Sequence, residues 1–362
     1  MTVRWVPDPL LLAIFHGLAS RSSHARAMIF TSKFKQICRV MEMDKMTFLR
    51  PDSRQNRLMD GLQKVVDAAV EAALKKFAAL NVRAEEIAAT LVDLSAGKNF
   101  PRAHHRGDEK IYPASVIKLF YLAAAHHWLA DGKISDTPEL RRALRDMIVD
   151  SGNEATGYVV DALTHTTSGL ELPPAELAAW HEKRNSVNRW FHSLGYADIN
   201  ANRKTWHDGP YGRDQQAVDQ FTPARNVLTT NTTARLLVEI ATRQCVSATH
   251  CEEILALMQR DFANPNATDH QGREFIGAGL PPDAKLWSKA GYMSTARHDA
   301  AIVELADGRK FILVIFTTRP DTKEIIPEIT RQILHEWRGE LSIRSPRTAA
   351  VFRAAESAAA VT

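Results

Sequence analysis

Residues 112–132 read YPASVIKLFYLAAAHHWLADG, and this stretch decides the fold because it opens a long apolar helix with a serine and a lysine. Hydrophobic side chains occur all round the segment, which is typical of a helix buried on every side. Lys118 lies one turn after Ser115 on the same face, where the two side chains are neighbours. Burial would lower the pKa of Lys118 and make it a base for the serine hydroxyl. The plain alternative is an N-cap serine beside a lysine that reaches the surface.

Strand patterns occur near both ends of the chain, with helical patterns between them. The predicted strands cover residues 87–94, 285–292, 299–305 and 310–317, and the predicted helices include 57–80, 138–149, 177–193 and 321–337. The first and last strands must therefore meet in one sheet while the helical block lies between them in sequence. We expect an α+β fold with two lobes, an antiparallel sheet flanked by helices and an all-helical lobe.

The two ends of the chain are expected to lie outside this fold. Residues 10–19 (LLLAIFHGLA) have the length and apolarity of a signal-peptide core, but prolines precede them and a histidine interrupts them. Residues 1–55 are therefore interpreted as a poorly ordered leader or a signal-like segment, and 341–362 as a flexible tail. One folded domain is predicted over 56–340. Its helical lobe covers about 115–260, and its sheet lobe is built from 57–110 and 280–340.

The composition of the 362-residue chain excludes several classes of protein. It is 45% hydrophobic and 24% charged, which is typical of globular domains. The net charge is +4 without clustered basic residues, so nucleic acid is not an expected partner. No stretch of about eighteen apolar residues predicts a membrane span. Of the three cysteines, Cys245 and Cys251 would pair only in an exported protein, and we expect them to be unpaired.

Three short motifs carry the candidate chemistry, although each is weak by itself. Ser-x-x-Lys occurs at 32–35, 95–98 and 115–118, and only the last of these opens a buried helix. Ser-x-Asn occurs at 151–153, in a turn between predicted helices, and again at 186–188, so it also fits an ordinary helix cap. Lys-Ala-Gly at 289–291 lies on a predicted strand, where a glycine indicates close approach of another group to the backbone.

In this order and on these elements, the motifs resemble those of the penicillin-recognising serine hydrolases, specifically the class A β-lactamase-like branch. The likeness extends over about residues 57–340. It is sharpest in YPASVIKLFYLAAA (112–125), VDSGNEATGYVVDAL (149–163) and WSKAGYMSTARHDAAIVEL (287–305). The resemblance implies a serine β-lactamase-like catalytic domain over 56–340.

The resemblance also implies a role for each catalytic residue. Ser115 would be the nucleophile that forms an acyl-enzyme, and Lys118 would be its base or proton relay. Ser151 would pass a proton to the departing nitrogen, and Lys289 would lower the cost of that transfer.

The substrate-binding residues follow from the same resemblance. Asn153 would hold the side-chain carbonyl of the substrate. The backbone N–H groups of Ser115 and Tyr292, next to Gly291, would form the oxyanion hole. Arg297 would bind the substrate carboxylate, where bidentate geometry favours arginine. The alternative for Arg297 is a structural pairing with Asp299 or with a surface acid near the sheet edge.

The sequence departs from the family pattern at positions that affect function. Gly152 replaces the usual aspartate of the second motif, and Ala290 replaces a hydroxyl-bearing residue of the third. Ser294 and Thr295 are the candidates to supply that hydroxyl instead. Class A enzymes carry a glutamate that positions the deacylating water, and no glutamate occurs in residues 194–224. Asp208 is the best acidic substitute, although an Asp-Gly turn is the simpler and favoured interpretation of this residue.

The resulting prediction is a serine hydrolase, with β-lactamase-like hydrolysis of a β-lactam amide as the leading function. A D-Ala-D-Ala peptidase or an esterase is the alternative enzyme, and a sensor module that is acylated once is the non-enzymatic alternative. We expect a small β-lactam or D-alanyl peptide as partner, a monomer, and no metal or organic cofactor. The pairs at 104–105 and 126–127 lack metal-site spacing and are assigned structural or surface roles. The resemblance implies a periplasmic or secreted location; without a functional signal the location would be cytoplasmic.

Overall fold

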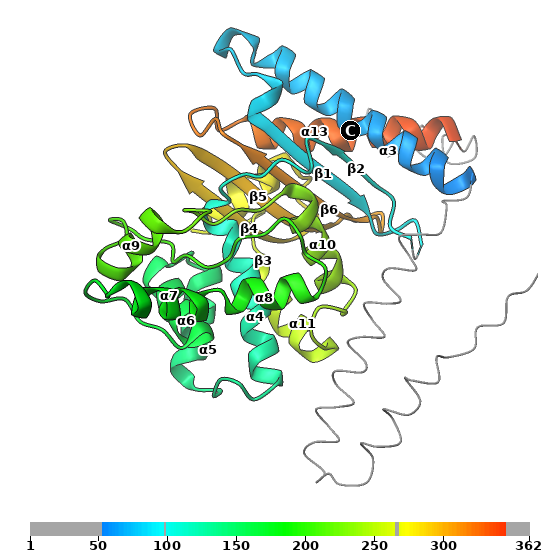
Figure 1. Cartoon of the computed structure of the whole chain (residues 1–362). Coiled ribbons are helices and arrows are strands. Elements are labelled where there is room, and N and C mark those ends of the chain that lie inside the picture. Colours follow the sequence, from blue (N-terminus) through cyan, green and yellow to red (C-terminus); the bar gives the residue numbers. More distant parts are fainter. Residues whose placement is uncertain (1–52, 98, 265–267, 345–362) are drawn as a thin grey trace, which may run out of the picture. The chain divides into compact units, whose positions relative to one another are not determined.

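A six-stranded antiparallel sheet forms the centre of the computed structural model, which describes residues 53–97, 99–264 and 268–344. The strand order is β2-β1-β6-β5-β4-β3 (Figure 1). The strands are β1 (Ile87–Asp93), β2 (Arg102–His105), β3 (Gln259–Arg260), β4 (Lys285–Met293), β5 (Ala296–Glu304) and β6 (Lys310–Thr317).

Strand β6 explains why the sheet needs cover on both faces. Its sequence KFILVIFT is an almost continuous apolar run, and the side chains from Phe311 to Phe316 are buried. Ile312, Val314 and Phe316 pack into one apolar cluster, while the alternate residues pack into the other. This is what a strand between two layers requires, because successive side chains point to opposite faces.

The strands from the two ends of the chain pair directly, as the sequence predicted. Ile87 of β1 lies opposite Thr317 of β6, and β6 pairs in turn with β5. The α+β fold class with an antiparallel sheet is thereby confirmed. Strand β5 begins at Ala296, three residues before the predicted start, because its first residues continue the pairing with β4.

Helices cover both faces of the sheet. Helices α3 (Ser53–Lys76) and α13 (Ile325–Arg344) contact each other on one face, and α10 (Thr230–Ala241) lies against β6 on the other (Figure 1). The remaining helices of the helical lobe are α4 (Lys118–Ala130), α5 (Pro138–Ile148), α6 (Asn153–Thr164), α7 (Pro174–Arg184), α8 (Ser186–Ser193), α9 (Gly212–Gln220) and α11 (Ala248–Met258). Two 3₁₀ turns, η1 (Ala78–Leu80) and η2 (Ala84–Glu86), connect α3 to β1.

Local sequence explains several helix starts. The hydroxyl of Thr137 accepts a hydrogen bond from the N–H of Leu140, and Pro138 occupies the first helical position of α5. Both features favour a helix N-terminus. The hydroxyl of Ser247 accepts from the N–H of His250 and starts α11 in the same way.

The segment between α6 and α10 contains more helix than the sequence predicted. The helix expected over 177–193 is divided into α7 and α8, and α9 is a helix that the sequence pattern does not predict. The structure also adds the short helix α12 (His270–Arg273), the 3₁₀ turn η4 (Ile276–Gly279) and the two-residue strand β3. Such short elements carry too few residues for a periodic pattern.

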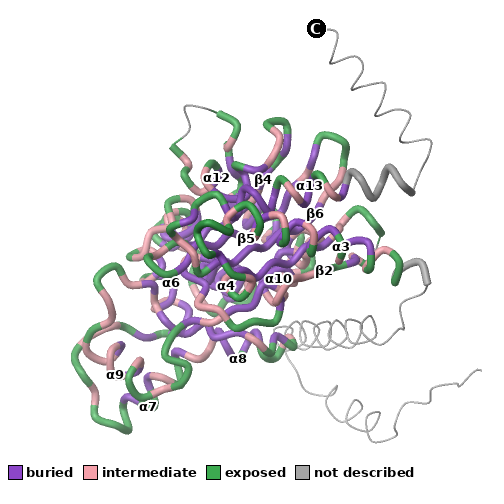
Figure 2. Tube along the Cα trace, turned by 90° about the horizontal axis from the view of Figure 1, so that it is seen from above, coloured by how far each residue is buried: buried purple, intermediate pink, exposed green. Residues whose placement is uncertain are grey.

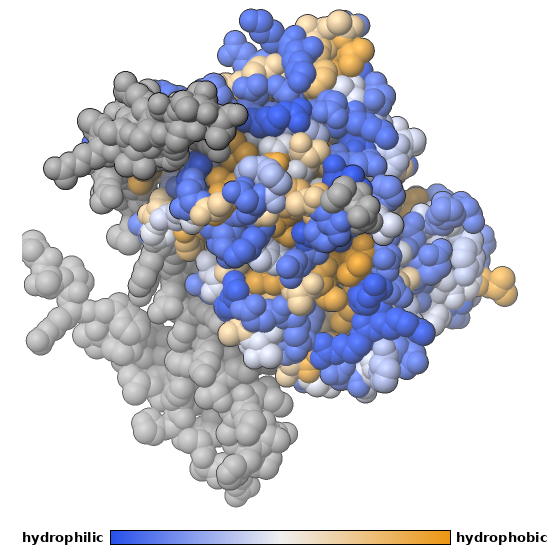
Figure 3. Space-filling view, turned by 180° about the vertical axis from the view of Figure 1, so that it is seen from behind, coloured by the Kyte–Doolittle hydropathy of each residue, from blue (hydrophilic) through white to orange (hydrophobic). Residues whose placement is uncertain are grey.

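The described residues all belong to one compact unit. The leader expected at 1–55 and the tail expected at 341–362 lie almost wholly outside the described residues. Where they are described, the chain is helical instead, because α3 begins at Ser53 and α13 ends at Arg344. Cys245 and Cys251 are not joined to each other by a disulfide bond, as expected. Among the described residues, no helix combines the length and the apolarity that crossing a membrane requires. On the face drawn in Figure 3, apolar side chains lie in patches between polar ones.

Candidate active site

Ser115 lies in a 3₁₀ turn, η3 (Ala114–Ile117), that runs directly into α4. The α-helix itself begins at Lys118, so the expected helix start is preceded by this tighter turn. Most of α4 is buried, and its trace runs through the buried interior in Figure 2. Ser115 itself is half-buried and remains at the border of the lobe.

Lys118 is fully buried and points toward the turn between α5 and α6. Its Nζ donates to the backbone oxygen of Ser151 at 2.6 Å and to Oδ1 of Asn153 at 2.9 Å, and it lies 3.3 Å from Oγ of Ser151. Burial lowers the pKa of Lys118 to about 7, although the charge of Glu154 acts against this shift. Within the described residues, no hydrogen bond joins this amine to Ser115. A neutral Lys118 can serve as a proton acceptor near neutral pH.

The turn residues Ser151 and Asn153 bring the second motif to Lys118. Ser151 has a φ of 57°, an uncommon left-handed conformation for a residue with a side chain. Its Oγ also accepts a hydrogen bond from Nζ of Lys289 at 3.0 Å. The hydroxyl of Ser151 therefore lies between the two lysines. Gly152 has an ordinary φ of −60°, so the departure from aspartate at this position is not imposed by backbone conformation.

Lys289 reaches this hydroxyl from strand β4 and is also fully buried. Burial and the nearby Lys118 cation hold the pKa of Lys289 well below its usual range. Its Nζ also donates to Oε1 of Gln271. Gln271 in turn donates from Nε2 to the backbone oxygens of Ile148 and Val149, at 3.1 and 2.7 Å. Gln271 thus connects the third motif to the end of α5.

Gly291 lies against the backbone that carries Ser115. A Cβ atom at this position would be 2.7 Å from the oxygen of Pro113 and 3.0 Å from the nitrogen of Ser115. Only a glycine leaves room for this approach. The position of a glycine within the strand predicted such a close approach from the sequence. The N–H groups of Ser115 and Tyr292 belong to the two segments that meet here.

His298, opposite Gly291 on β5, holds the segment before Ser115 in place. Its Nδ1 accepts from the N–H of Thr317 at 3.1 Å, so its Nε2 carries the proton that it donates to the oxygen of Tyr112 at 2.9 Å. Burial lowers the pKa of His298 to about 4 and keeps the ring neutral.

Arg297, the second residue of β5, lies on the other face of the sheet. It lies opposite Tyr292, and opposite residues of an antiparallel pair share a face. Since side chains alternate along a strand, Lys289 and Gly291 project from the opposite face. Arg297 therefore has to reach round the edge of β4 to contact a group bound at Ser115.

The guanidinium of Arg297 has partners within the protein. Its Nη2 donates to the backbone oxygen of Glu274 at 2.8 Å and lies 3.5 Å from the Glu274 carboxylate, and its plane lies over the ring of Phe275. The side chain is 2% exposed. This is the pairing with an acid near the sheet edge that the alternative interpretation described, with Glu274 in place of Asp299. Asp299 instead accepts from the N–H groups of Ile276 and Ala300.

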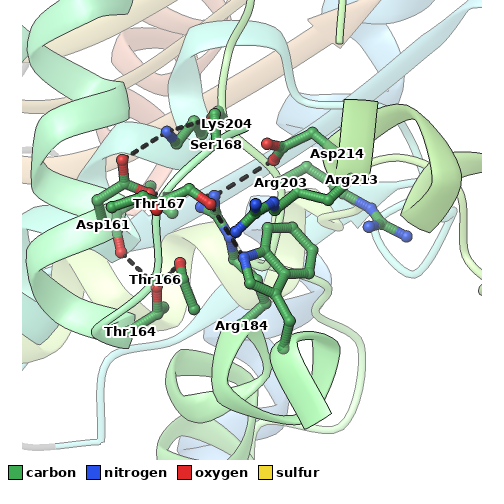
Figure 4. Close-up of polar contacts among 12 residues, drawn as sticks. Asp161, Thr164, Thr166, Thr167, Ser168, Arg184, Arg203, Lys204, Arg213 and Asp214 are labelled. Carbon is green, nitrogen blue, oxygen red and sulfur yellow. Dashed lines mark hydrogen bonds and ion pairs between the residues drawn. The ribbon is translucent and has the colours of Figure 1, made fainter. Parts of the chain in front are cut away.

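A chain segment containing Lys204 and Trp206 passes beside Asn153, whose Nδ2 donates to the oxygen of Trp206 at 3.4 Å. Lys204 anchors the segment by an ion pair with Asp161 at 2.6 Å and a hydrogen bond to Ser168 at 2.7 Å (Figure 4). Asp208, which follows, is exposed.

Two features of this region bear on deacylation and on stability. Gly209 has a φ of 103°, so Asp208 belongs to the Asp-Gly turn that the simpler interpretation proposed. The fully buried Arg184 pairs with Asp161 at 3.0 Å and with Asp214 at 3.2 Å (Figure 4). Burial raises the pKa of Asp214 and lowers that of Arg184.

The structure thus brings Ser115, Lys118, Ser151, Asn153, Lys289 and Gly291 to one border of the sheet and the helical lobe. Sequence reasoning missed Gln271, His298 and Glu274. None of these belongs to a motif, and only the folded chain brings them beside the motif residues.

The model of the Beta-lactamase enzyme family matches residues 135–337, which leaves Ser115 and Lys118 outside the matched range. The chain is similar to a β-lactamase from Sphaerobacter thermophilus, with a TM-score of 0.54 and 20% identity over 75% of this chain and 96% of that one. It is also similar to a PBP-A variant solved as an acyl-enzyme complex with penicillin G, with a TM-score of 0.53 and 17% identity over 75% and 96% of the two chains.

A third similar structure is a variant of the class A β-lactamase of the last common ancestor of Gram-negative bacteria, with a TM-score of 0.54 and 17% identity over 75% of this chain and 99% of that one. No curated protein matches the chain. At these identities the solved structures show the fold, while the family match covers more than half of the chain. The chain therefore belongs to the β-lactamase enzyme family and has the fold of the β-lactamase-like serine hydrolases.

Proposed function

We propose that this protein opens β-lactam amides through an acyl-enzyme at Ser115. The observation that carries the proposal is the line of hydrogen bonds from Lys118 through the Ser151 hydroxyl to Lys289, beside the close contact of Gly291 with Ser115. Two lysines of lowered pKa joined by a hydroxyl provide a route for a proton at neutral pH.

In the proposed reaction, Ser115 Oγ attacks the lactam carbonyl and its proton passes to neutral Lys118. The N–H groups of Ser115 and Tyr292 stabilise the oxyanion. When the C–N bond breaks, the Ser151 hydroxyl gives its proton to the departing nitrogen and is reprotonated from the Lys118 ammonium, while Lys289 holds the hydroxyl in place. Asn153 orients the side-chain carbonyl of the substrate. Atoms and charge balance, and the product is an ester of Ser115.

The acylation step is tested by intact mass after incubation with a fluorescent penicillin. One adduct per chain is expected for the wild type and none for Ser115→Ala. Ser95→Ala is the matched control, because Ser95 begins another Ser-x-x-Lys motif but is exposed in a turn. Labelling that persists in Ser115→Ala would contradict the assignment of the nucleophile.

A second function is favoured by one observation about deacylation. Residues 194–224 contain no glutamate, and Asp208 is an exposed turn residue. A protein without a glutamate here to position the deacylating water would release a β-lactam acyl group slowly. It would then act on other substrates as a D-Ala-D-Ala peptidase or esterase, or would hold its acyl group as a sensor. Steady hydrolysis of a chromogenic cephalosporin supports the β-lactamase function. A burst of one equivalent supports the sensor, and turnover of esters or D-alanyl peptides alone supports the peptidase or esterase.

A further inference from the structure

Two helices of the helical lobe bring together three side chains that are common metal ligands. His126 lies on α4, while His250 and Glu253 lie one turn apart on α11. The side chain of His126 is 1% exposed, whereas those of His250 and Glu253 are 20% and 38% exposed. The cluster therefore has a buried inner ligand and can be reached from solvent past α11.

The spacing of the ligand atoms fits one ion. Nδ1 of His126 lies 3.0 Å from Nδ1 of His250, and Oε2 of Glu253 lies 3.6 and 3.9 Å from these two nitrogens. Ligands bound tetrahedrally to zinc at about 2.0–2.2 Å are about 3.3 Å apart. Across the residues that the structure describes, this is the one group of three such side chains whose ligand atoms all lie within 4.8 Å of one another.

The neighbouring histidine, His127, takes no part in this cluster. Its ring stacks on Trp190 with 4.6 Å between centroids, and its Nε2 lies 3.5 Å from Asp131. Of the 126–127 pair, for which the sequence predicted structural or surface roles, only His126 belongs to the cluster. His126 alone lies beside the His-x-x-Glu pattern of α11. The two segments are distant in sequence, so no local pattern predicts that they come together.

We propose that His126, His250 and Glu253 bind one divalent transition-metal ion of the zinc class, with water completing its coordination. Two imidazoles and one carboxylate suit zinc, whereas magnesium and calcium prefer oxygen ligands alone. The ion would join α11 to α4, the helix that begins with Lys118. This role is structural and does not depend on the proposed acyl-enzyme chemistry.

Two features of the cluster set the strength of binding. Nη1 of Arg141 lies 2.6 Å from Oε2 of Glu253 and competes with the ion for that oxygen, while the same guanidinium also binds both oxygens of Asp136. Nε2 of His126 is buried and has no hydrogen-bond partner among the described residues, so it would carry an unpaired proton when Nδ1 binds the ion. We expect binding weaker than that of a closed structural zinc site.

Titration of the chelator-treated full chain tests the proposal. Zinc is followed by calorimetry, and cobalt by the visible absorption of its tetrahedral complexes. One ion per chain is expected, together with a saturable rise in the temperature of unfolding. His250→Ala and Glu253→Gln should each weaken binding at least about tenfold. Arg141→Gln should strengthen binding, because it removes the competing cation.

The matched controls are His127→Gln, on the same helix, and His270→Ala, from an exposed His–Glu pair without a second histidine. Both should bind zinc as the wild type does. Circular dichroism without metal checks that each variant is folded, and His250→Gln replaces His250→Ala if the latter is not. No binding by the wild type, or binding that survives both His250 and Glu253 substitutions, would overturn the proposal. An Arg141→Gln variant without increased affinity would contradict the role of Glu253.

Discussion

The amine of Lys118 has the partners that a neutral lysine can satisfy. A neutral amine has two N–H donors and one lone pair, and the oxygens of Ser151 and Asn153 lie within 3 Å to accept both donors. The lone pair is then available to accept the proton of the Ser115 hydroxyl in the proposed reaction. In the ammonium form a third N–H donor replaces the lone pair, so protonation removes the base.

The first prediction concerns the pH dependence of acylation. Because the pKa of Lys118 is lowered to about 7, the neutral base is lost as pH falls through that value. The acylation rate with a fluorescent penicillin should level off above the pKa and fall about tenfold for each pH unit below it. Lys118→Arg, which stays protonated, should be slow at every pH. A wild-type rate that is constant or that rises toward acid would refute Lys118 as the base.

The second prediction concerns Arg297 and its partner Glu274. If Arg297 binds a substrate carboxylate, Arg297→Ala should slow acylation by carboxylate-bearing substrates about 10–100-fold and leave a neutral ester of similar size almost unchanged. Glu274→Gln should increase the rate with the charged substrate, because it removes the anion that competes for the guanidinium. Ala290→Thr should partly restore carboxylate binding in the Arg297→Ala background.

Rates for the two substrates separate the binding role of Arg297 from a structural one. Equal losses with the charged and the neutral substrate in Arg297→Ala, with no effect of Glu274→Gln, would show that the arginine only supports Phe275 and the sheet edge.

Strand β4 and the turn η3 approach each other more closely than any side chain would allow, which leads to the third prediction. Gly291→Ala would place its Cβ 2.7 Å from the oxygen of Pro113 and force the two elements apart. Because both proposed oxyanion donors belong to these elements, acylation should fall by about 10²–10³. The control is Gly157→Ala, whose Cβ would meet its nearest atom, Cδ of Lys204, at 3.5 Å. A Gly291→Ala variant with an unchanged acylation rate would exclude this arrangement.

Helices α6, α7 and α9 are joined through the buried ion pairs of Arg184, which leads to the fourth prediction. Arg184→Met would leave Asp214 buried without its cation, and the free energy of unfolding should fall by about 3–5 kcal/mol. The double variant Arg184→Met/Asp214→Leu should recover most of the loss, since no uncompensated charge remains at that position. Denaturant unfolding measures both.

Arg189→Met provides the matched control for this pair. Arg189 pairs with Glu182 on the surface, with the two side chains 51% and 71% exposed. Its loss should cost at most about 1 kcal/mol. A similar cost for Arg184→Met would mean that the buried pair contributes no more than a surface pair.

For the molecule as a whole, local patterns predicted the larger elements, and tertiary contacts decided the rest. The apolar run of β6 and the capped start of α5 are read directly from sequence, as is the buried segment that became α4. The roles of Gln271 and His298 were not predictable, because their partners Lys289 and Tyr112 belong to other elements. The three motifs could be predicted because the family they resemble carries them in a fixed order. The contacts that their residues make could not be predicted, because the partners belong to other elements.

The fifth prediction concerns the part of the chain that the proposed activity needs. Every residue of the candidate site, and the α3–α13 layer behind the sheet, lies within residues 53–344. A chain beginning at residue 53 should therefore keep the circular dichroism and the acylation rate per folded molecule of the full chain. Loss of labelling in such a chain, with its secondary structure intact, would show that the first 52 residues contribute to the site.

The pairing of β1 with β6 has a consequence for synthesis on the ribosome. Strand β1 is synthesised early, but its partner β6 ends at Thr317. The two strands therefore cannot pair until translation has passed that residue. Bringing such distant segments together is slow, because loop-closure entropy must be overcome before the contact forms. Until then β1 has an unpaired edge and Ser115 lacks β4 behind it. A growing polypeptide therefore cannot complete its candidate site until these last strands have left the exit tunnel.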